Sequence, residues 1–169
     1  MRYIDFDGTM VDTEDVLFTD WRKNPDRHSL PETKKIDYIA NANWHQILID
    51  SPVMMDSIYI IRQMNPAESA ILTKVHSMNN EALEKIRYLR DALVKQPIII
   101  VPYMYKKTDV VMAKGNELID DGLFNLDDWA LAGGYPMFFD AKGNNIDSWN
   151  KENKNGYQRV RKINEKRES

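Results

Sequence analysis

The feature that most constrains the fold is the stretch over residues 3–9, where a short apolar run leads into Asp5-Phe6-Asp7-Gly8-Thr9. This pattern predicts a buried strand with acidic groups at its carboxyl end, where ligands bind in open α/β sheets. Residues two apart on a strand point to the same side, so Asp5 and Asp7 can face one site. Gly8 lets the backbone turn sharply and approach a ligand. The alternative is a turn in which Asp, Gly and Thr only cap and solvate the chain.

Further apolar runs follow at intervals that predict strands alternating with helices. Strands are expected over residues 69–73, 98–101, 117–119 and 136–139, and the run 98–101 is expected to be buried on both faces. A helix after Asn80 has Leu83, Ile86, Leu89 and Leu93 as one stripe, with Glu81 and Lys85 on its exposed face. Strands alternating with helices imply a parallel sheet with right-handed crossovers.

The segment between the first carboxylates and the second strand is too long for a plain crossover and suits a small helical cap. An amphipathic helix is predicted over residues 54–64, because Met55, Ile58, Ile61 and Met64 recur at helical spacing. The C-terminal segment 151–169 carries seven Lys or Arg and three Glu, with Val160 and Ile163 as a thin apolar edge. A solvated tail or a loosely docked terminal helix is expected there.

Four motifs, taken in chain order, resemble those of the haloacid dehalogenase superfamily: Asp5-Phe6-Asp7-Gly8-Thr9, Leu72-Thr73, Lys107 and Ile119-Asp120-Asp121. The resemblance spans roughly residues 2–140. It implies a Rossmann-like α/β fold with strand order 5-4-1-2-3. The expected domains are a catalytic core over 1–14 and 67–150, a small helical cap over 15–66, and a basic tail or terminal helix over 151–169.

The resemblance implies a phosphatase site. A carboxylate can attack phosphorus, so Asp5 is the expected nucleophile, and Asp7 is the expected general acid/base. Mg²⁺ prefers oxygen ligands, and the family pattern implies that Asp5, the Asp7 backbone carbonyl and Asp120 supply them. Asp121 is expected to support these ligands from behind without binding the ion itself. The remaining expected roles belong to Thr73 and Lys107 at the phosphoryl group and to Gly8, Thr9 and Lys74 at the substrate.

The position of the motif lysine is open. Lys106 and Lys114 are alternatives to Lys107, which best matches the spacing in relatives. Lys74 departs from the small or hydroxyl residue that is expected in nucleotidases; it contacts phosphate or only lines the rim.

Within the superfamily, the chain most resembles the cytosolic 5'(3')-deoxyribonucleotidase-like group. The residues that carry this resemblance are Gly115–Asp121, Asn125, Trp129 and Ala132–Gly134, and more weakly Asn43-Trp44-His45 with Ser51-Pro52. It implies that Trp44 and His45 line a pocket for a nucleobase. The alternative is that Trp44 belongs to the core of the cap.

Composition limits the possible partners and chemistry. The chain has no cysteine, which removes disulfides and thiolate catalysis, and its net charge of −3 gives no overall nucleic-acid footprint. No run approaches the ~20 apolar residues of a membrane span. The first strand begins at Arg2, so no signal peptide is expected and a cytoplasmic location is predicted. The expected partner is a small phosphorylated metabolite, above all a nucleoside monophosphate; nucleic acid is not expected, and the oligomeric state is open.

The sequence therefore predicts a Mg²⁺-dependent phosphomonoester hydrolase that forms an aspartyl-phosphate, most specifically a 5'-nucleotidase or deoxyribonucleotidase. One alternative is a phosphatase for sugar phosphates or polynucleotide ends. Another is a catalytically weak binding or regulatory protein that uses only the fold.

Overall fold

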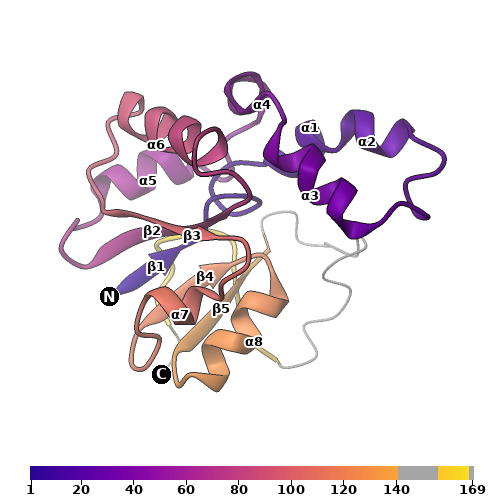
Figure 1. Cartoon of the computed structure of the whole chain (residues 1–169). Helices are drawn as coiled ribbons and strands as arrows, with labels where there is room; N and C mark the ends of the chain where they lie inside the picture. The colour runs from indigo at the N-terminus through magenta and orange to yellow at the C-terminus, as the bar shows by residue number, and fades with distance from the viewer. Residues whose placement is uncertain (141–155, 168–169) are drawn as a thin grey trace.

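The computed structural model describes residues 1–140 and 156–167, and in these residues the core is a six-stranded parallel sheet (Figure 1). The strand order is β3-β2-β1-β4-β5-β6, which confirms the predicted order 5-4-1-2-3 and adds a sixth strand next to β5. Every neighbouring pair is parallel. The strands are β1 (Arg2–Ile4), β2 (Ser69–Val75), β3 (Ile98–Pro102), β4 (Glu117–Asp120), β5 (Tyr135–Phe139) and β6 (Gln158–Val160).

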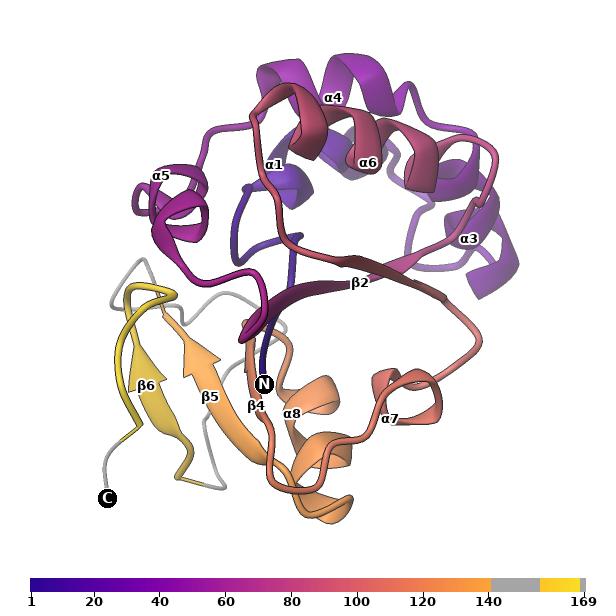
Figure 2. The ribbon, with the colours of Figure 1, turned by 90° about the vertical axis from the view of Figure 1, so that its left-hand side faces the viewer.

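Helices cover both faces of the sheet because its central strands are apolar on both sides. Neighbouring residues of β2 point to opposite faces, so Ile71 packs into the cluster of Leu89 from α6 (Glu81–Asp91), and Leu72 joins the cluster of Trp129 from α8 (Leu123–Leu131). Figure 2 shows α6 on one side of β2, and α8 with the short α7 (Lys107–Val110) on the other.

The third strand differs from its expected burial. Of the run 98–101, Val101 alone is fully buried, and the other three residues are partly exposed. The reason is position: β3 is the edge of the sheet, so it has a neighbouring strand on one side only. A β-branched run does not by itself distinguish an edge strand from a central one.

The segment between β1 and β2 is helical, as expected of a cap. It contains α1 (Thr13–Leu17), α2 (Thr19–Lys23), α3 (Glu32–Ala40), α4 (Trp44–Asp50) and α5 (Ser57–Gln63). Figure 1 shows α1–α3 beyond the carboxyl ends of the strands, with α4 above and α5 beside α6. The apolar cluster of the sheet continues into this segment through Ile39, Trp44 and Ile61. The division into cap and core at residues 15–66 remains a prediction.

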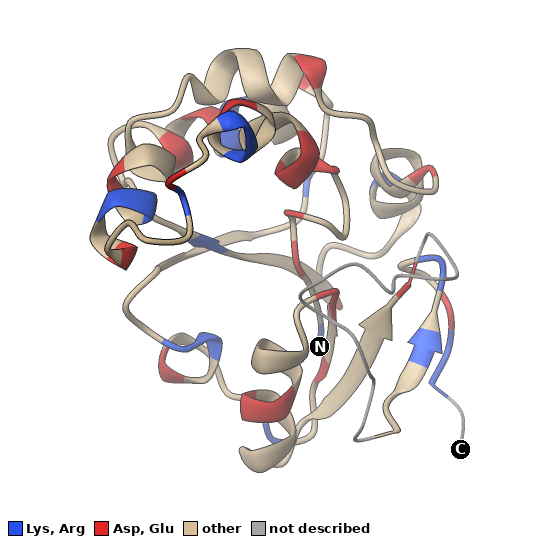
Figure 3. Ribbon diagram, turned by 90° about the vertical axis from the view of Figure 1, so that its right-hand side faces the viewer, with Lys and Arg blue, Asp and Glu red and all other residues tan. Residues whose placement is uncertain are grey.

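The C-terminal segment is a strand where a tail or terminal helix was predicted. Its residues Gln158–Val160 form β6 against β5, and both Val160 and Ile163 are fully buried. The two apolar residues are three apart, which fits a helix, but in the structure both belong to the buried apolar cluster of the sheet. Lys and Arg lie on β6 and the segment after it (Figure 3). Residues 141–155 and 168–169, which belong to the predicted core and tail, lie outside the described residues.

Among the residues that the structure describes, no helix is both long and apolar enough to cross a membrane.

Candidate active site

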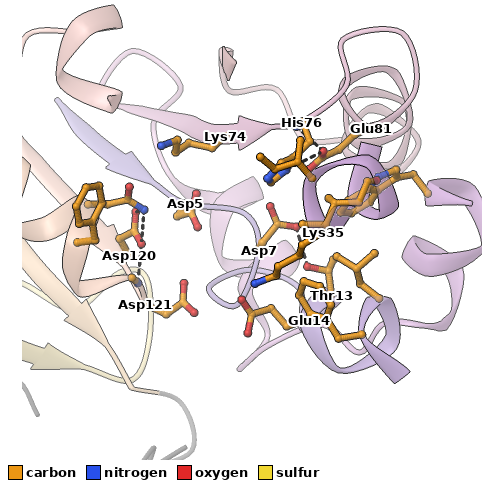
Figure 4. A pocket seen from close by; sticks show the side chains of 18 of the residues that line it. Asp5, Asp7, Thr13, Glu14, Lys35, Lys74, His76, Glu81, Asp120 and Asp121 are labelled. Carbon is orange, nitrogen blue, oxygen red and sulfur yellow. Dashed lines mark hydrogen bonds and ion pairs between the residues drawn. The ribbon is translucent and has the colours of Figure 1, made fainter. Parts of the chain in front are cut away.

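A cavity of about 390 Å³ lies at the carboxyl ends of β1, β2 and β4, where the sheet meets α1, α3 and α8. Its polar side chains come from both the sheet and the helices. Figure 4 shows the Asp5, Asp120 and Asp121 carboxylates together on one side and Asp7 nearer to the helical segment. The polar lining includes Asp5, Asp7, Thr13, Glu14, Lys35, Lys74, His76, Glu81, Asp120 and Asp121.

Asp5 and Asp120 are joined by one buried lysine. Lys107 Nζ donates to Asp5 Oδ1 at 2.5 Å and to Asp120 Oδ2 at 2.6 Å, and all three side chains are almost fully buried. Burial alone would lower the pKa of Lys107, but Asp120 and Asp5 outweigh it and raise the pKa. The lysine therefore stays charged and holds the nucleophile candidate beside Asp120.

The choice between neighbouring lysines is clear from their surroundings. Lys106 is exposed and its Nζ donates to Asp128 at 2.6 Å, away from Asp5 and Asp120. Lys114 lies against Gly133. Of the three alternatives, Lys107 is the one that the structure brings to Asp5 and Asp120.

Asp121 lies beside Asp5 and Asp120 at the cavity, and its supporting role behind the metal ligands stays a prediction. Carboxylate oxygens of Asp5, Asp120 and Asp121 lie within 4.8 Å of one another. The Thr9 hydroxyl donates to Asp121 Oδ1 at 3.3 Å, and Gly8, with φ +68°, has its Cα so close that a Cβ would lie 2.1 Å from Asp121 Oδ2. Gly8 and Thr9 therefore make room for Asp121 and support it.

The three carboxylates carry more negative charge than Lys107 neutralises. Burial, opposed by Lys107 and reinforced by Asp120, raises the pKa of Asp5 to about 7. Burial, together with Asp120 and Asp5, raises the pKa of Asp121 well above its usual range. Oxygen-only donors with unrelieved negative charge suit a hard divalent cation such as Mg²⁺. The donor set therefore fits the ion that the resemblance implied.

Asp120 is held in place from behind by the start of α8. The Gly122 amide donates to Asp120 Oδ1 at 2.7 Å, and Asn125 Nδ2 donates to Oδ2 at 3.0 Å (Figure 4). These contacts orient the carboxylate toward Lys107 and the cavity.

Asp7 is turned away from this cluster toward α1 and α6. Its Oδ1 accepts from the Thr13 hydroxyl at 2.7 Å, and its Oδ2 accepts from Lys85 Nζ at 2.5 Å. The Asp7 side chain is 27 % exposed, so it reaches the cavity while Thr13 and Lys85 hold its two oxygens. Two carboxylates of one strand end thus serve opposite sides of the cavity.

Thr73 and Lys74, at the end of β2, take different positions. The Thr73 hydroxyl is buried and lies 3.5 Å from Asp7 Oδ2. Lys74 lines the cavity, and burial, together with nearby Lys107, lowers its pKa. The lysine that departs from the nucleotidase pattern therefore faces the cavity.

Of the two residues predicted to stack on a nucleobase, Trp44 lines the cavity and His45 does not. Trp44 is 2 % exposed, and its Nε1 donates to the Ile39 carbonyl at 2.9 Å. His45 is 62 % exposed and pairs with Glu84 at 3.1 Å. Trp44 is therefore a buried side chain that also lines the cavity, so the stacking role and the alternative, a place in the core of the cap, both stay predictions. Phe18 and Phe124 are other rings that line the cavity.

Sequence reasoning missed Lys85 and Glu81, which it expected on the exposed face of their helix. Both are buried, and Lys85 Nζ contacts Glu81 Oε1 at 2.6 Å. In the structure Leu83 and Leu93 are exposed, and the buried face of the helix runs through Ala82, Lys85 and Leu89. These three residues have helical spacing, so a lysine inside an otherwise apolar stripe was the available signal.

The sheet and the acidic site together define a class, the Rossmann-like α/β proteins that bind ligands at the carboxyl ends of parallel strands. No family model and no curated protein matches the chain. Solved structures do resemble it, among them two that match it over nearly its whole length. A protein described as a dehalogenase has a TM-score of 0.57 and 11 % identity, with 96 % of this chain and 92 % of that chain covered.

The second is a protein described as a HAD-hydrolase, YfnB from Bacillus subtilis, in a structure bound to magnesium. Its TM-score is 0.52 at 13 % identity, with 96 % of this chain and 94 % of that chain covered. The chain therefore has the fold of these two proteins over nearly its whole length.

Proposed function

We propose that the protein is a Mg²⁺-dependent phosphomonoesterase in which Asp5 is the nucleophile and Asp7 the general acid and base. The single observation that carries this proposal is the arrangement around Asp5. The Asp5 carboxylate accepts a hydrogen bond from Lys107 and lies in a cluster with Asp120 and Asp121. Asp7 faces the same cavity from the helical side. The nucleophile and the proton donor thus face one cavity, and the counter-charge contacts the nucleophile directly.

The reaction follows from these positions. A carboxylate oxygen of Asp5 attacks phosphorus, and the bond from phosphorus to the leaving oxygen breaks. The leaving oxygen keeps the electron pair of that bond and receives a proton from Asp7. Water then attacks the aspartyl-phosphate and gives a proton to Asp7. The bond from phosphorus to Asp5 breaks, the carboxylate recovers its electron pair, and inorganic phosphate leaves. Lys107 stabilises negative charge on the transferring group.

Asp5, Asp120 and Asp121 are the residues that would hold Mg²⁺, with the Asp7 backbone carbonyl as the further ligand that the family resemblance implies. When bound, the ion supplies positive charge that offsets repulsion between the carboxylates and a phosphate dianion. The Thr73 hydroxyl lies beside Asp7, and Lys74 and Lys35 are the two lysines that line the cavity.

Nucleoside monophosphates are the proposed substrate class, with Phe18 and Phe124 as the rings that contact the base. Phe124 is 70 % exposed, and both rings line the cavity. Base–aromatic stacking is worth ~1–3 kcal/mol, enough to favour a nucleotide over a sugar phosphate. Seven carboxylates line the cavity against two lysines, which disfavours a polynucleotide end as the substrate.

The test is phosphate release from an aryl phosphate with Mg²⁺ and with EDTA, for the wild type and Asp5→Asn. Turnover that requires both the ion and Asp5 supports the proposal. Substantial turnover in EDTA or in the variant contradicts it, and no turnover at all favours a binding protein that uses only the fold.

The substrate class is tested by kcat/KM for nucleoside monophosphates against hexose and triose phosphates. The wild type should prefer nucleotides by roughly tenfold or more, and Phe18→Ala should reduce that preference. Equal values for both sets in the wild type would end the nucleotidase interpretation and leave the phosphatase intact.

A further inference from the structure

We propose that Lys85 is a positioning residue, which holds the Asp7 carboxylate where it can protonate the leaving group, and that Glu81 is its buried counter-charge. The proposal rests on the phosphatase reaction proposed above. Lys85 comes from α6 and is fully buried, so it contacts Asp7 without reaching the substrate space itself.

The contacts of Lys85 fix its ammonium from several sides. Besides Asp7 Oδ2 at 2.5 Å and Glu81 Oε1 at 2.6 Å, Nζ lies 3.2 Å from the Lys74 carbonyl and 3.4 Å from the Thr73 hydroxyl. The ring centroids of Trp44 and Phe6 lie 4.9 and 5.5 Å from the same nitrogen. Two rings and four oxygens leave the side chain little freedom, so its position is set before a substrate arrives.

Burial of a lysine at this position lowers the stability of the fold, because its charge loses contact with water. Its neighbours on the buried stripe of α6 are Ala82 and Leu89, and an apolar side chain would pack there without desolvating a charge. Glu81, one turn earlier on the same helix, offsets part of the cost and is itself held by the His76 amide, which donates to its Oε2 at 2.7 Å. Lys85 and Glu81 therefore already neutralise each other, and the contact from Lys85 to Asp7 is made in addition to that pair.

The consequence for Asp7 is a fixed carboxylate plane. Lys85 binds Oδ2 and Thr13 binds Oδ1 at 2.7 Å, so neither rotation about the side chain nor withdrawal from the cavity is free. Correct placement of a catalytic group matters steeply, because a misplacement of about 1 Å can cost ~10²-fold in rate. Loss of Lys85 should therefore impair proton donation while Asp5, Lys107 and the metal ligands stay in place.

The test is the dependence of kcat/KM on the leaving group, measured with phosphate monoesters from nitrophenyl to alkyl phosphates. The main variant is Lys85→Met with Glu81→Gln, which removes both buried charges together and leaves neither unpaired. Arg87→Met is the matched control, because Arg87 is an exposed cation on the same helix, paired with Glu84. Asp7→Asn gives the full effect of losing the proton donor.

We expect the double variant to lose ~10²-fold in kcat/KM on alkyl phosphates and much less on nitrophenyl phosphates, whose leaving groups need little protonation. KM should change less than kcat, since Lys85 does not touch the substrate. Arg87→Met should behave like the wild type. On alkyl phosphates, the kcat/KM of the double variant should lie between those of Arg87→Met and Asp7→Asn. Lys85→Gln with Glu81→Gln, which keeps a donor near the same place and leaves no buried charge unpaired, should show the same pattern with a smaller loss.

Three results would overturn the proposal: a uniform loss over all leaving groups, no loss at all, or failure of both Lys85 variants to fold, which would make the lysine a support of the fold. The phosphatase proposal fails separately. It fails if the wild type turns over none of the esters, or if Asp5→Asn is as active as the wild type.

Discussion

At the scale of single residues, neighbours in sequence have opposite surroundings. Lys106 and Lys107 are adjacent, yet one is exposed beside Asp128 and the other is buried between Asp5 and Asp120. The motif resemblance singled out Lys107, but no local pattern could do so, because the difference comes from where α7 begins relative to the sheet. The chemistry of a lysine here depends on the tertiary structure.

The first prediction uses this pair. Lys107→Ala should lower kcat by roughly 10²-fold or more, because electrostatic stabilisation of the transferring phosphoryl group is lost. Lys106→Ala is the matched control and should matter much less. The measurement is steady-state kinetics on an aryl phosphate with saturating Mg²⁺. The reverse ranking would show that the motif lysine lies one residue earlier.

A second prediction concerns Asp5 and pH in the metal-free protein. The pKa of Asp5 rises from its ordinary value of 3.8 to about 7, so the folded state binds this proton more tightly than the unfolded state. The resulting stabilisation is present below pH 3.8 and is lost as pH rises through about 7. In EDTA at pH 8, Asp5→Asn should therefore be more stable than the wild type by at least ~1 kcal/mol.

The measurement is the melting temperature of both proteins in EDTA at pH 5 and pH 8. The gap should widen with pH. The same gap at both values would contradict the raised pKa of Asp5. A variant that is more stable and inactive would mean that the acidic site costs the fold stability, as functional sites commonly do.

At the scale of elements, patterns predicted where helices and strands lie better than which face each one buries. The spacing of Leu83, Ile86, Leu89 and Leu93 indicated a helix correctly, but its buried face includes Lys85. The spacing of apolar residues cannot identify that face, because the lysine is buried through its contacts with Asp7, which is distant in sequence, and with Glu81, one turn earlier on the same helix. The missing information is tertiary, and it concerns the candidate site.

The third prediction belongs to α4. Trp44→Ala should destabilise the protein by ~3–5 kcal/mol, since it empties a buried volume and removes the hydrogen bond to Ile39. Substrate preference among phosphate esters should change little if the variant folds. The measurements are denaturant unfolding and kcat/KM for nucleotides and sugar phosphates. Loss of nucleotide preference with unchanged stability would support the stacking role for Trp44.

At the scale of the whole molecule, the order of the central strands was predictable and the sixth strand was not. Alternating strands and helices with right-handed crossovers allow few topologies, and the family resemblance selected one that the structure confirms. The strand β6 has only three residues, of which Val160 alone is apolar, so its pattern gave no strand signal. What defines it is the free edge of β5, on which it pairs.

The last prediction is that Mg²⁺ stabilises the entire fold through the carboxylate cluster, because an ion that binds only the folded state shifts the unfolding equilibrium by mass action. At a concentration of about 100 times Kd, the gain is ~2.7 kcal/mol, which for a domain of this size corresponds to a rise in Tm of roughly 5–10 °C. Asp120→Asn should abolish most of the rise, since Asp120 is a buried member of the cluster. Glu117→Gln, on the same strand but paired with Arg2, is the control and should keep it. An unchanged Tm in millimolar Mg²⁺, or an equal rise in both variants, would mean that these carboxylates do not hold the ion.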